Sequence, residues 1–339
     1  MDIDNVRKEN TRTRVRIGYL MAILCAIFWG AWYIPGGLVF NLEPFVNLFG
    51  DGEFTQAEYI YQAILVTGIN ALFVVLVLMF WCAGLGKLKE MKRSVMDLKH
   101  CTKYYFAGAI FGGPMAILGT YIATTFGNSG FSAVSALCYP IIGMSLSVLW
   151  LHQKMSHRAI AGLLVILVGG IVCYSEGLFS GTIQPLGYVG GLMAIFGWGI
   201  EGAVAAKGLD ASEPDVALTL RFVMECVIWW VITIPILCLS GVDMFNGIEK
   251  IFDPVTFLTL LMMGLTFGLC YVTWYKSFPL IGVGRGQAVG SLYGLMAIVF
   301  LWLFTGSASV FYLVGAIICI IGTFMLFTEK TDDMDSLRG

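Results

Sequence analysis

The stretch GYLMAILCAIFWGAWYIPGG at residues 18–37 runs through a full membrane-spanning length without a charged side chain. A helix needs about 20 predominantly apolar residues to cross the hydrocarbon core of a bilayer. Nine further apolar stretches of this kind follow it, at residues 62–84, 104–125, 131–151, 158–174, 185–206, 217–240, 255–276, 286–305 and 309–328. The sequence therefore predicts an all-α polytopic membrane protein with ten transmembrane helices.

The composition of the whole chain supports this prediction. Of its 339 residues, 58% are hydrophobic and only 12% are charged, against about 25% charged residues in ordinary globular proteins. The net charge of −2 leaves no electrostatic footprint for nucleic acid, and the nine cysteines show no metal-type spacing. A soluble enzyme, a DNA-binding protein and a secreted disulfide scaffold are excluded. The expected partners are the lipid bilayer and a small molecule, with no metal and no cofactor.

The positions of the basic residues predict the orientation. With ten alternating spans, eighteen of the twenty Lys and Arg residues fall on one side; Arg221 lies just inside a span, and Lys250 lies on the other side. Cytoplasmic loops carry the excess of basic residues. We therefore expect a cytoplasmic basic N-tail at residues 1–17, a cytoplasmic C-tail at 329–339 and a location in the cell membrane.

The segment at residues 39–61 is long for an outer connection between two spans, and it mixes aromatic with acidic residues. Two interpretations are open. It is either a loop resting at the interface, or an outer lid or short interfacial helix over the entry of a substrate.

The two halves of the chain contain similar stretches of sequence, which indicates an internal repeat. The first span contains GY, AIF and Trp-Gly, and the sixth span, GYVGGLMAIFGWGIEGAVAAK from Gly187, contains the same elements in the same order. The fourth span, SAVSALCYPIIGMSLSVLWL, pairs likewise with the ninth, QAVGSLYGLMAIVFLWLF. Because each half has an odd number of spans, residues 18–176 and 185–328 form two inverted-topology five-helix repeats. Secondary transporters use such repeats to build two alternately open states around a midplane site.

The stretches YIATTFGNSGFSAVSALCYPI at 121–141 and WYKSFPLIGVGRGQAVGSLYGL at 274–295, within this ten-span arrangement, resemble EamA-type members of the drug/metabolite transporter superfamily. The resemblance covers residues 18–328. It implies two inverted five-helix repeats around a central cavity, and the transport of a small organic metabolite. One departure is the lack of the Glu that members often carry near the ends of the fourth and ninth spans, where this chain reads LHQKMS and LFTGSAS.

Three ionisable residues lie inside the predicted spans: Glu201, Arg221 and Glu225. An intramembrane charge is costly unless it is paired, hydrated or neutralised, so these residues are candidates for coupling or gating. Arg221 and Glu225 are spaced i, i+4 and can pair on one helix face. Glu201 has no basic residue at helical spacing in its own span, which leaves it as a satisfied structural carboxyl, a substrate counter-ion or a proton site.

Aromatic residues near the midplane form the candidate substrate site. Trp29, Trp32 and Tyr33 form a stripe on the first span, and Trp198 occupies the place in the sixth span that matches Trp29. Tyr and Trp rings together with one carboxylate suit an organic cation through cation–π attraction, and the arrangement resembles that of bacterial choline transporters. The predicted substrate-binding residues are Trp29, Trp32, Tyr33, Tyr139, Trp198, Glu201, Gln287, Ser291 and Tyr293.

The leading hypothesis is a secondary active transporter of an organic cation, such as choline or another quaternary ammonium compound or amine. Coupling of this transport to protons is part of the hypothesis. Amino acids, sugars and nucleobases are the alternative substrates, in either direction of transport. An intramembrane enzyme would need a nucleophile with a base, an acid dyad or metal ligands within the spans. The spans contain no His, and we assign no catalytic residue. The oligomeric state, monomer or homodimer, stays open.

Overall fold

The structure is a computed structural model that describes residues 3–50, 52–96, 99–305 and 309–329. These residues form helices, loops and turns without a strand, which confirms the all-α class. The predicted C-tail after residue 329 lies outside the described residues. The helices are α1 (Ile3–Leu38), α2 (Gln56–Gly84), α3 (Leu88–Met96), α4 (Lys99–Ile110), α5 (Leu118–Phe126), α6 (Ser129–Leu137), α7 (Tyr139–Leu149), α8 (His157–Cys173), α9 (Ser175–Leu178), α10 (Pro185–Gly208), α11 (Pro214–Cys226), α12 (Ile234–Leu239), α13 (Pro254–Ile281), α14 (Val283–Gly290), α15 (Tyr293–Thr305) and α16 (Val310–Phe327).

Among the described residues, nine helical segments are long and apolar enough to cross a membrane. They correspond to nine of the ten predicted spans. The remaining predicted span, at 158–174, corresponds to α8, which is apolar but shorter. A polytopic membrane protein is therefore confirmed, and ten helices remain compatible with the structure.

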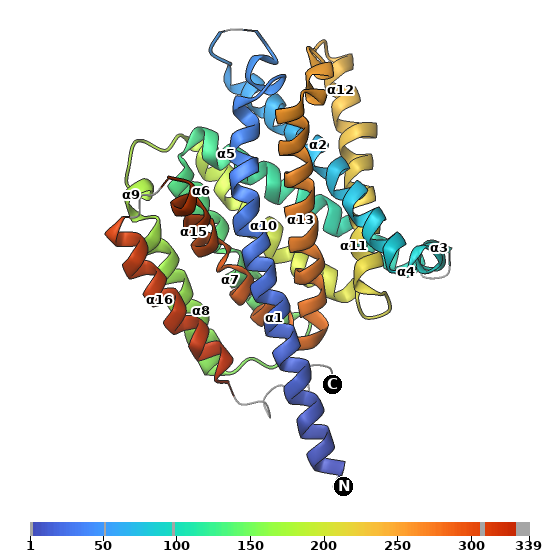
Figure 1. Cartoon of the computed structure of the whole chain (residues 1–339), viewed down its shortest axis with the longest axis vertical. Helices are drawn as coiled ribbons and strands as arrows, with labels where there is room; N and C mark the ends of the chain where they lie inside the picture. Colours follow the sequence, from blue (N-terminus) through green and yellow to red (C-terminus); the bar gives the residue numbers. More distant parts are fainter. Residues whose placement is uncertain (1–2, 51, 97–98, 306–308, 330–339) are drawn as a thin grey trace.

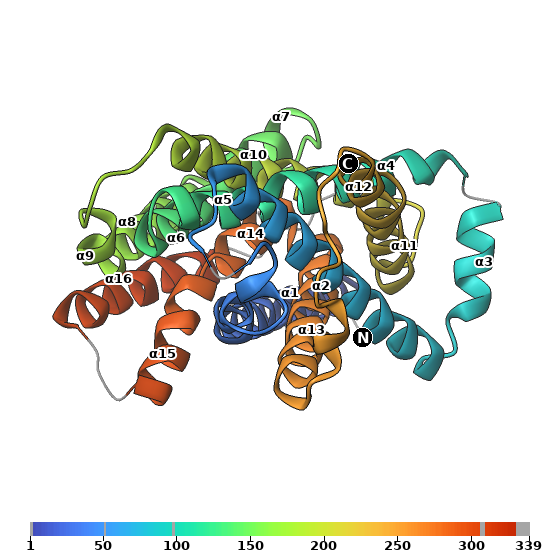
Figure 2. The same ribbon diagram turned by 90° about the horizontal axis from the view of Figure 1, so that it is seen from above.

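The helices pack in a pattern that is compatible with the predicted inverted repeat (Figures 1 and 2). The first span, α1, packs along α13, the eighth; its counterpart, α10, packs along α5 and the preceding π-helical segment Phe111–Ile117, which belong to the third. The pairs α2 with α11, α7 with α14 and α8 with α16 each join a span to its own counterpart. Exchanging the halves thus reproduces the same contacts.

The two ends of the bundle differ in what they carry. In Figure 1 the start of α1 and the end of α16 lie at the lower end, and the connection between α1 and α2 lies at the upper end. The phenol of Tyr19 in α1 donates a hydrogen bond to the carbonyl of Leu326 in α16 at 3.1 Å, which ties these two segments together. The basic segment before residue 18 continues α1 as a helix in its described part.

The fourth and ninth spans are each interrupted, although the sequence analysis treats both as continuous. The fourth breaks at Cys138, between α6 and α7, and the ninth breaks at residues 291–292, between α14 and α15. Pro140 in the first turn of α7 has no N–H to continue the hydrogen bonding of α6. The second half of each interrupted span starts at a tyrosine, Tyr139 in α7 and Tyr293 in α15. Helices broken near the midplane are typical of the substrate sites of transporters.

The outer segment 39–61 is folded onto the bundle. It contains two 3-10 turns, Val39–Asn41 and Phe45–Asn47, and its last residues already belong to α2. The helix begins there because Thr55 and Glu58 form a capping box. The segment is held by a hydrogen bond from Gln62 to the carbonyl of Phe45, at 2.9 Å. It is an anchored cover at one end of the bundle.

Candidate functional site: an aromatic cavity and a buried charge cluster

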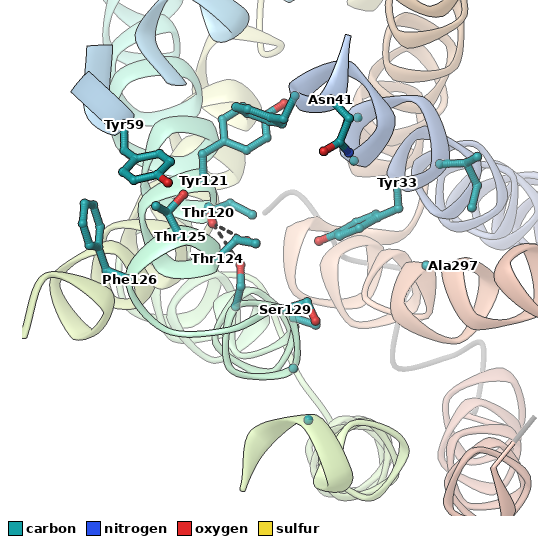
Figure 3. A pocket seen from close by; sticks show the side chains of 18 of the residues that line it. Tyr33, Asn41, Tyr59, Thr120, Tyr121, Thr124, Thr125, Phe126, Ser129 and Ala297 are labelled. Carbon is teal, nitrogen blue, oxygen red and sulfur yellow. Dashed lines mark hydrogen bonds between the residues drawn. The ribbon is translucent and has the colours of Figure 1, made fainter. Parts of the chain in front are cut away.

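A cavity of about 900 Å³ lies at the end of the bundle that carries the segment 39–55 (Figure 3). Residues of α1, α2, α5, α6 and α15 form its wall, and Tyr33, Tyr121, Thr120, Thr124 and Ser129 surround it in the close view. Pockets for small organic molecules have volumes of about 300–1,000 Å³. The cavity therefore has room for a metabolite-sized ligand.

The deep part of the cavity has two unpartnered hydrogen-bond donors. Trp32 is 2% exposed and Tyr121 is 7% exposed, and both line the cavity. Neither the indole N–H of Trp32 nor the phenol of Tyr121 has a hydrogen-bond partner among the described residues. A buried polar group without a partner costs about 1–3 kcal/mol. Both donor atoms are buried, so a ligand oxygen that reached them after a movement of these side chains would remove that cost.

A layer of packed aromatic rings closes the cavity toward the middle of the protein. Trp29 stacks on Tyr293 at 4.3 Å between ring centroids and contacts Trp198 edge-on at 4.8 Å. Tyr139 and Trp274 complete the layer, each within 6.2 Å of Trp29. All five side chains are buried. The layer forms a solid floor rather than an open cage.

The two broken spans are linked within this layer. Tyr139 donates a hydrogen bond to the carbonyl of Gln287 at 3.0 Å, and the amide of Gln287 donates to the carbonyl of Trp198 at 3.0 Å. Gly143 makes room for this amide, because a Cβ there would lie 1.4 Å from its oxygen. The hydroxyl of Ser291 donates to the carbonyl of Ala288. Of these hydrogen bonds, the one from Tyr139 to Gln287 joins the two halves, and the other two lie within the second half.

The structure thus separates the nine predicted substrate-binding residues into three groups. Trp32 and Tyr33 line the cavity. Six others lie in the packed layer beneath it, namely Trp29, Tyr139, Trp198, Gln287, Ser291 and Tyr293. Glu201 belongs to a charge cluster farther from the cavity wall.

Glu201 is paired with Arg221, a residue of a different helix. The Nε atom of Arg221 lies 2.8 Å from a carboxylate oxygen of Glu201, and Arg221 also forms the i, i+4 pair with Glu225. The phenol of Tyr271 donates to Glu201 at 2.9 Å, and the indole of Trp229 donates to Glu225 at 3.3 Å. The three charged side chains are fully or almost fully buried. One guanidinium therefore serves two carboxyl groups.

A short series of contacts leads from the cavity to this charge cluster. The ring of Trp32 stacks on Phe267 at 4.8 Å, and Phe267 contacts Tyr271 at 4.9 Å. Tyr271 in turn holds the carboxylate of Glu201. Two side chains, Phe267 and Tyr271, therefore connect Trp32 at the cavity with Glu201 in the charge cluster.

Ion pairs hold the helices together at the opposite end of the bundle. Asp215, whose side chain is 0% exposed, contacts Lys87 after α2 and lies 2.9 Å from Lys276 of α13. Lys87 also lies 2.6 Å from Glu213. Burial lowers the pKa of Lys87, but the two carboxylates outweigh that effect and raise it above its ordinary value. Lys87 stays charged at neutral pH, and these ion pairs connect α2, α11 and α13 at this end.

Several of these residues are missing from the sequence-based prediction. Tyr121, Phe267 and Tyr271 are ordinary aromatic residues of apolar spans, and no spacing distinguishes them. Glu213 and Asp215 flank Pro214 at the start of a helix, where acids are common. The acidic start of this helix is a signal that could have indicated a partner for the basic residues of a neighbouring loop.

Long apolar helices around a cavity, with two spans interrupted near their middles, define a polytopic membrane protein. Residues 56–175 match the model of the EamA-like transporter family, so this part of the chain is similar to that family. A crystal structure of another protein is similar in fold, with a TM-score of 0.67 and 13% sequence identity over 91% of this chain and 94% of the other. No curated protein matches the sequence.

Proposed function

We propose that the protein is a secondary active transporter that moves a small organic solute across the cell membrane by alternating access. The observation that supports this proposal is a cavity that extends from one end of the bundle to an aromatic layer, while ion pairs tie helices together at the other end. Alternating access requires a site that is accessible from one side at a time. The accessible side carries the segment 39–55, which the distribution of basic residues predicts to be outside.

The proposal is tested by transport in liposomes that contain the purified protein. The probes are radiolabelled D-glucose, choline, glutamate and adenine, which represent a sugar, a cation, an amino acid and a nucleobase. A transporter gives saturable uptake of at least one probe, and preloading with unlabelled probe accelerates that uptake. Proteoliposomes that match protein-free liposomes for every probe would overturn the proposal.

A larger side chain at Gly37 is expected to block the cavity. Gly37 lines the cavity, and a Cβ built on it meets no atom within 4 Å, so Gly37→Leu places its side chain in open space without a clash. Gly84 at the end of α2 offers equally open space and does not line the cavity. We expect Gly37→Leu to reduce uptake to background and Gly84→Leu to leave it unchanged. Equal uptake by both variants would remove the cavity from the transport path.

An organic cation is the substrate class that the sequence favours, because aromatic faces can bind it. Trp32 and Tyr33 both line the cavity, and desolvated cation–π contacts contribute up to about 2 kcal/mol. Two observations argue against an organic cation as the substrate. Among the described residues that line the cavity, none is acidic, and Glu201 is already paired with Arg221. Uptake of choline in the transport assay tests whether the substrate is an organic cation.

We further propose that Glu201, Arg221 and Glu225 couple transport to protons. With both carboxyl groups ionised the cluster has a formal charge of −1, and one proton makes it neutral. A net charge inside a membrane is costly, which favours a cluster that binds and releases that proton during the cycle. The amide in Glu201→Gln keeps the shape and removes the charge change.

The expected result is that an inward proton gradient alters the uptake rate of the wild type, whereas Glu201→Gln transports at the same rate with or without the gradient. Glu249→Gln, at an exposed carboxyl group of an outer loop, is the control and should keep the wild-type response. Size-exclusion chromatography verifies that each variant is folded. An unchanged response to the gradient in Glu201→Gln would leave this residue with a structural role.

A further inference from the structure

The described part of the cavity wall is neutral, although charged residues lie elsewhere in the protein. Among the described residues that line it, none is Asp, Glu, Lys or Arg. A charged solute that leaves water for such a cavity loses hydration and gains no opposite charge, which is strongly unfavourable. The buried acids Glu201 and Glu225 are held by Arg221. The wall favours a solute without net charge.

The same wall is rich in hydroxyl and amide groups. They occur on both sides of the cavity and on its rim: Asn41, Gln56, Gln62, Thr120, Thr124, Thr125, Ser129, Ser132 and Gln184. Hydroxyl and amide groups can each donate and accept hydrogen bonds. The hydroxyls of Thr120 and Thr124 donate to backbone carbonyls of their own helix, so their oxygens remain as acceptors. A solute that both donates and accepts around its whole perimeter fits this wall.

The deep end of the cavity adds donors and flat apolar surfaces. The free N–H of Trp32 and the free hydroxyl of Tyr121 are donors without a partner, and both side chains are more than nine-tenths buried. The partly exposed rings of Tyr33 and Phe40 provide apolar surface in the same cavity. A sugar ring has hydroxyl groups at its edge and apolar C–H groups on its faces, and so matches both features. A quaternary ammonium compound would leave the two donors unpaired.

From these features we infer that the substrate of the proposed transporter is a neutral polyhydroxylated solute of sugar size, bound with its acceptor oxygens at Trp32 and Tyr121. This inference rests on the proposed transport function and names the substrate class of the same cavity. Of the alternatives open to the sequence, a nucleobase stacks on aromatic rings but has polar groups only in its plane. An amino acid has two charges, for which the described wall offers no partner.

The test uses proteoliposomes and the neutral sugars D-glucose, D-mannose and D-ribose, with choline, glutamate and adenine as competing probes. We expect saturable uptake of at least one sugar and none of the three competing probes. Trp32→Phe keeps the aromatic face and removes the N–H, and should weaken sugar affinity by about five- to tenfold, which is the loss of one hydrogen bond. Trp302→Phe, at an exposed Trp of α15 outside the cavity wall, should behave as the wild type.

Each outcome separates the two proposals. Saturable uptake of choline, glutamate or adenine without uptake of a sugar overturns the inference and leaves the transport function standing. Sugar uptake that Trp32→Phe and Trp302→Phe affect equally overturns the binding position at Trp32. Absence of uptake for all six probes overturns both proposals.

Discussion

Gly112 and Gly113 create the space in which the buried charges meet. Both lie in the π-helical segment Phe111–Ile117. A Cβ at Gly112 would lie 1.6 Å from the Nη2 atom of Arg221, and a Cβ at Gly113 would lie 2.5 Å from the carboxyl group of Glu225. π-Helical segments inside longer helices often occur at functional sites. The ion pairs of Arg221 and Glu225 therefore depend on glycine at both positions, because a side chain at either would occupy their space.

Gly112→Ala is expected to displace Arg221 and destabilise the protein by about 3 kcal/mol, the cost of disrupting a buried ion pair. Gly108→Ala is the matched control on the same predicted span. Its Cβ would lie 3.4 Å from the Cγ atom of Arg221, which is ordinary contact. The melting temperature in detergent, followed by tryptophan fluorescence, should fall only for Gly112→Ala. Equal melting temperatures for the two variants would mean that Arg221 moves aside without cost.

The sequence predicts this cluster only in part. The spacing of Arg221 and Glu225 on one helix indicates their contact, because helix geometry alone fixes it. The contact between Glu201 and Arg221 depends on how α10 packs against α11, and no local pattern encodes that packing. The same limit explains Tyr121, whose part in the cavity arises from the approach of α1 and α5. The place of Trp32 and Tyr33 at the cavity could be predicted, because the aromatic stripe to which they belong lies on one helix and follows from the sequence spacing alone.

At the scale of helices, the closed end depends on Asp215 at the start of α11. It is the common partner of Lys87 and Lys276, which come from the ends of two other spans. Both lysines are partly exposed, so each pair contributes about 0.5–1 kcal/mol rather than the value of a fully buried pair. Together they bias the helices toward the closed arrangement.

Asp215→Asn should therefore shift the equilibrium toward conformations open at this end, by roughly tenfold if both pairs are lost. The measurement is the labelling rate of a cysteine introduced as Leu209→Cys, which is buried in the closed arrangement. Glu90→Gln, which removes a surface pair with Arg93, is the control and should leave the rate unchanged. A labelling rate that does not respond to Asp215→Asn would show that other contacts close this end.

At the scale of the whole molecule, corresponding residues of the two predicted repeats lie in different surroundings. Trp32 follows Trp29 by three residues and faces the open cavity, and Glu201 follows Trp198 by three residues and is sealed within the charge cluster. In transporters with inverted repeats, the halves exchange conformations when the cavity changes sides. The exchange would bring Glu201 to the surface of the cavity at the other end. This gives the proposed proton site access to one side only after the substrate has moved.

The orientation of this asymmetric molecule in the membrane is the last prediction. The basic loops predict that the segment 39–61 is outside and the segment 87–103 is inside. Gly52→Cys occupies open space in the outer segment, and Lys92→Cys lies in the basic one. A membrane-impermeant maleimide applied to intact cells should label Gly52→Cys, and label Lys92→Cys only after permeabilisation. The wild type controls for the native cysteines, among which Cys101 in the basic segment is buried.

The opposite labelling pattern would reverse the physiological meaning of the structure. The cavity would then open to the cytoplasm, and the ion pairs of Asp215 would close the outer end. The basic residues cluster at the end opposite the cavity. Such a result would therefore place the basic loops outside the cell, contrary to the rule that basic loops stay in the cytoplasm. Labelling of neither variant in intact cells, with both labelled after permeabilisation, would indicate an internal membrane rather than the cell membrane as the location of the protein.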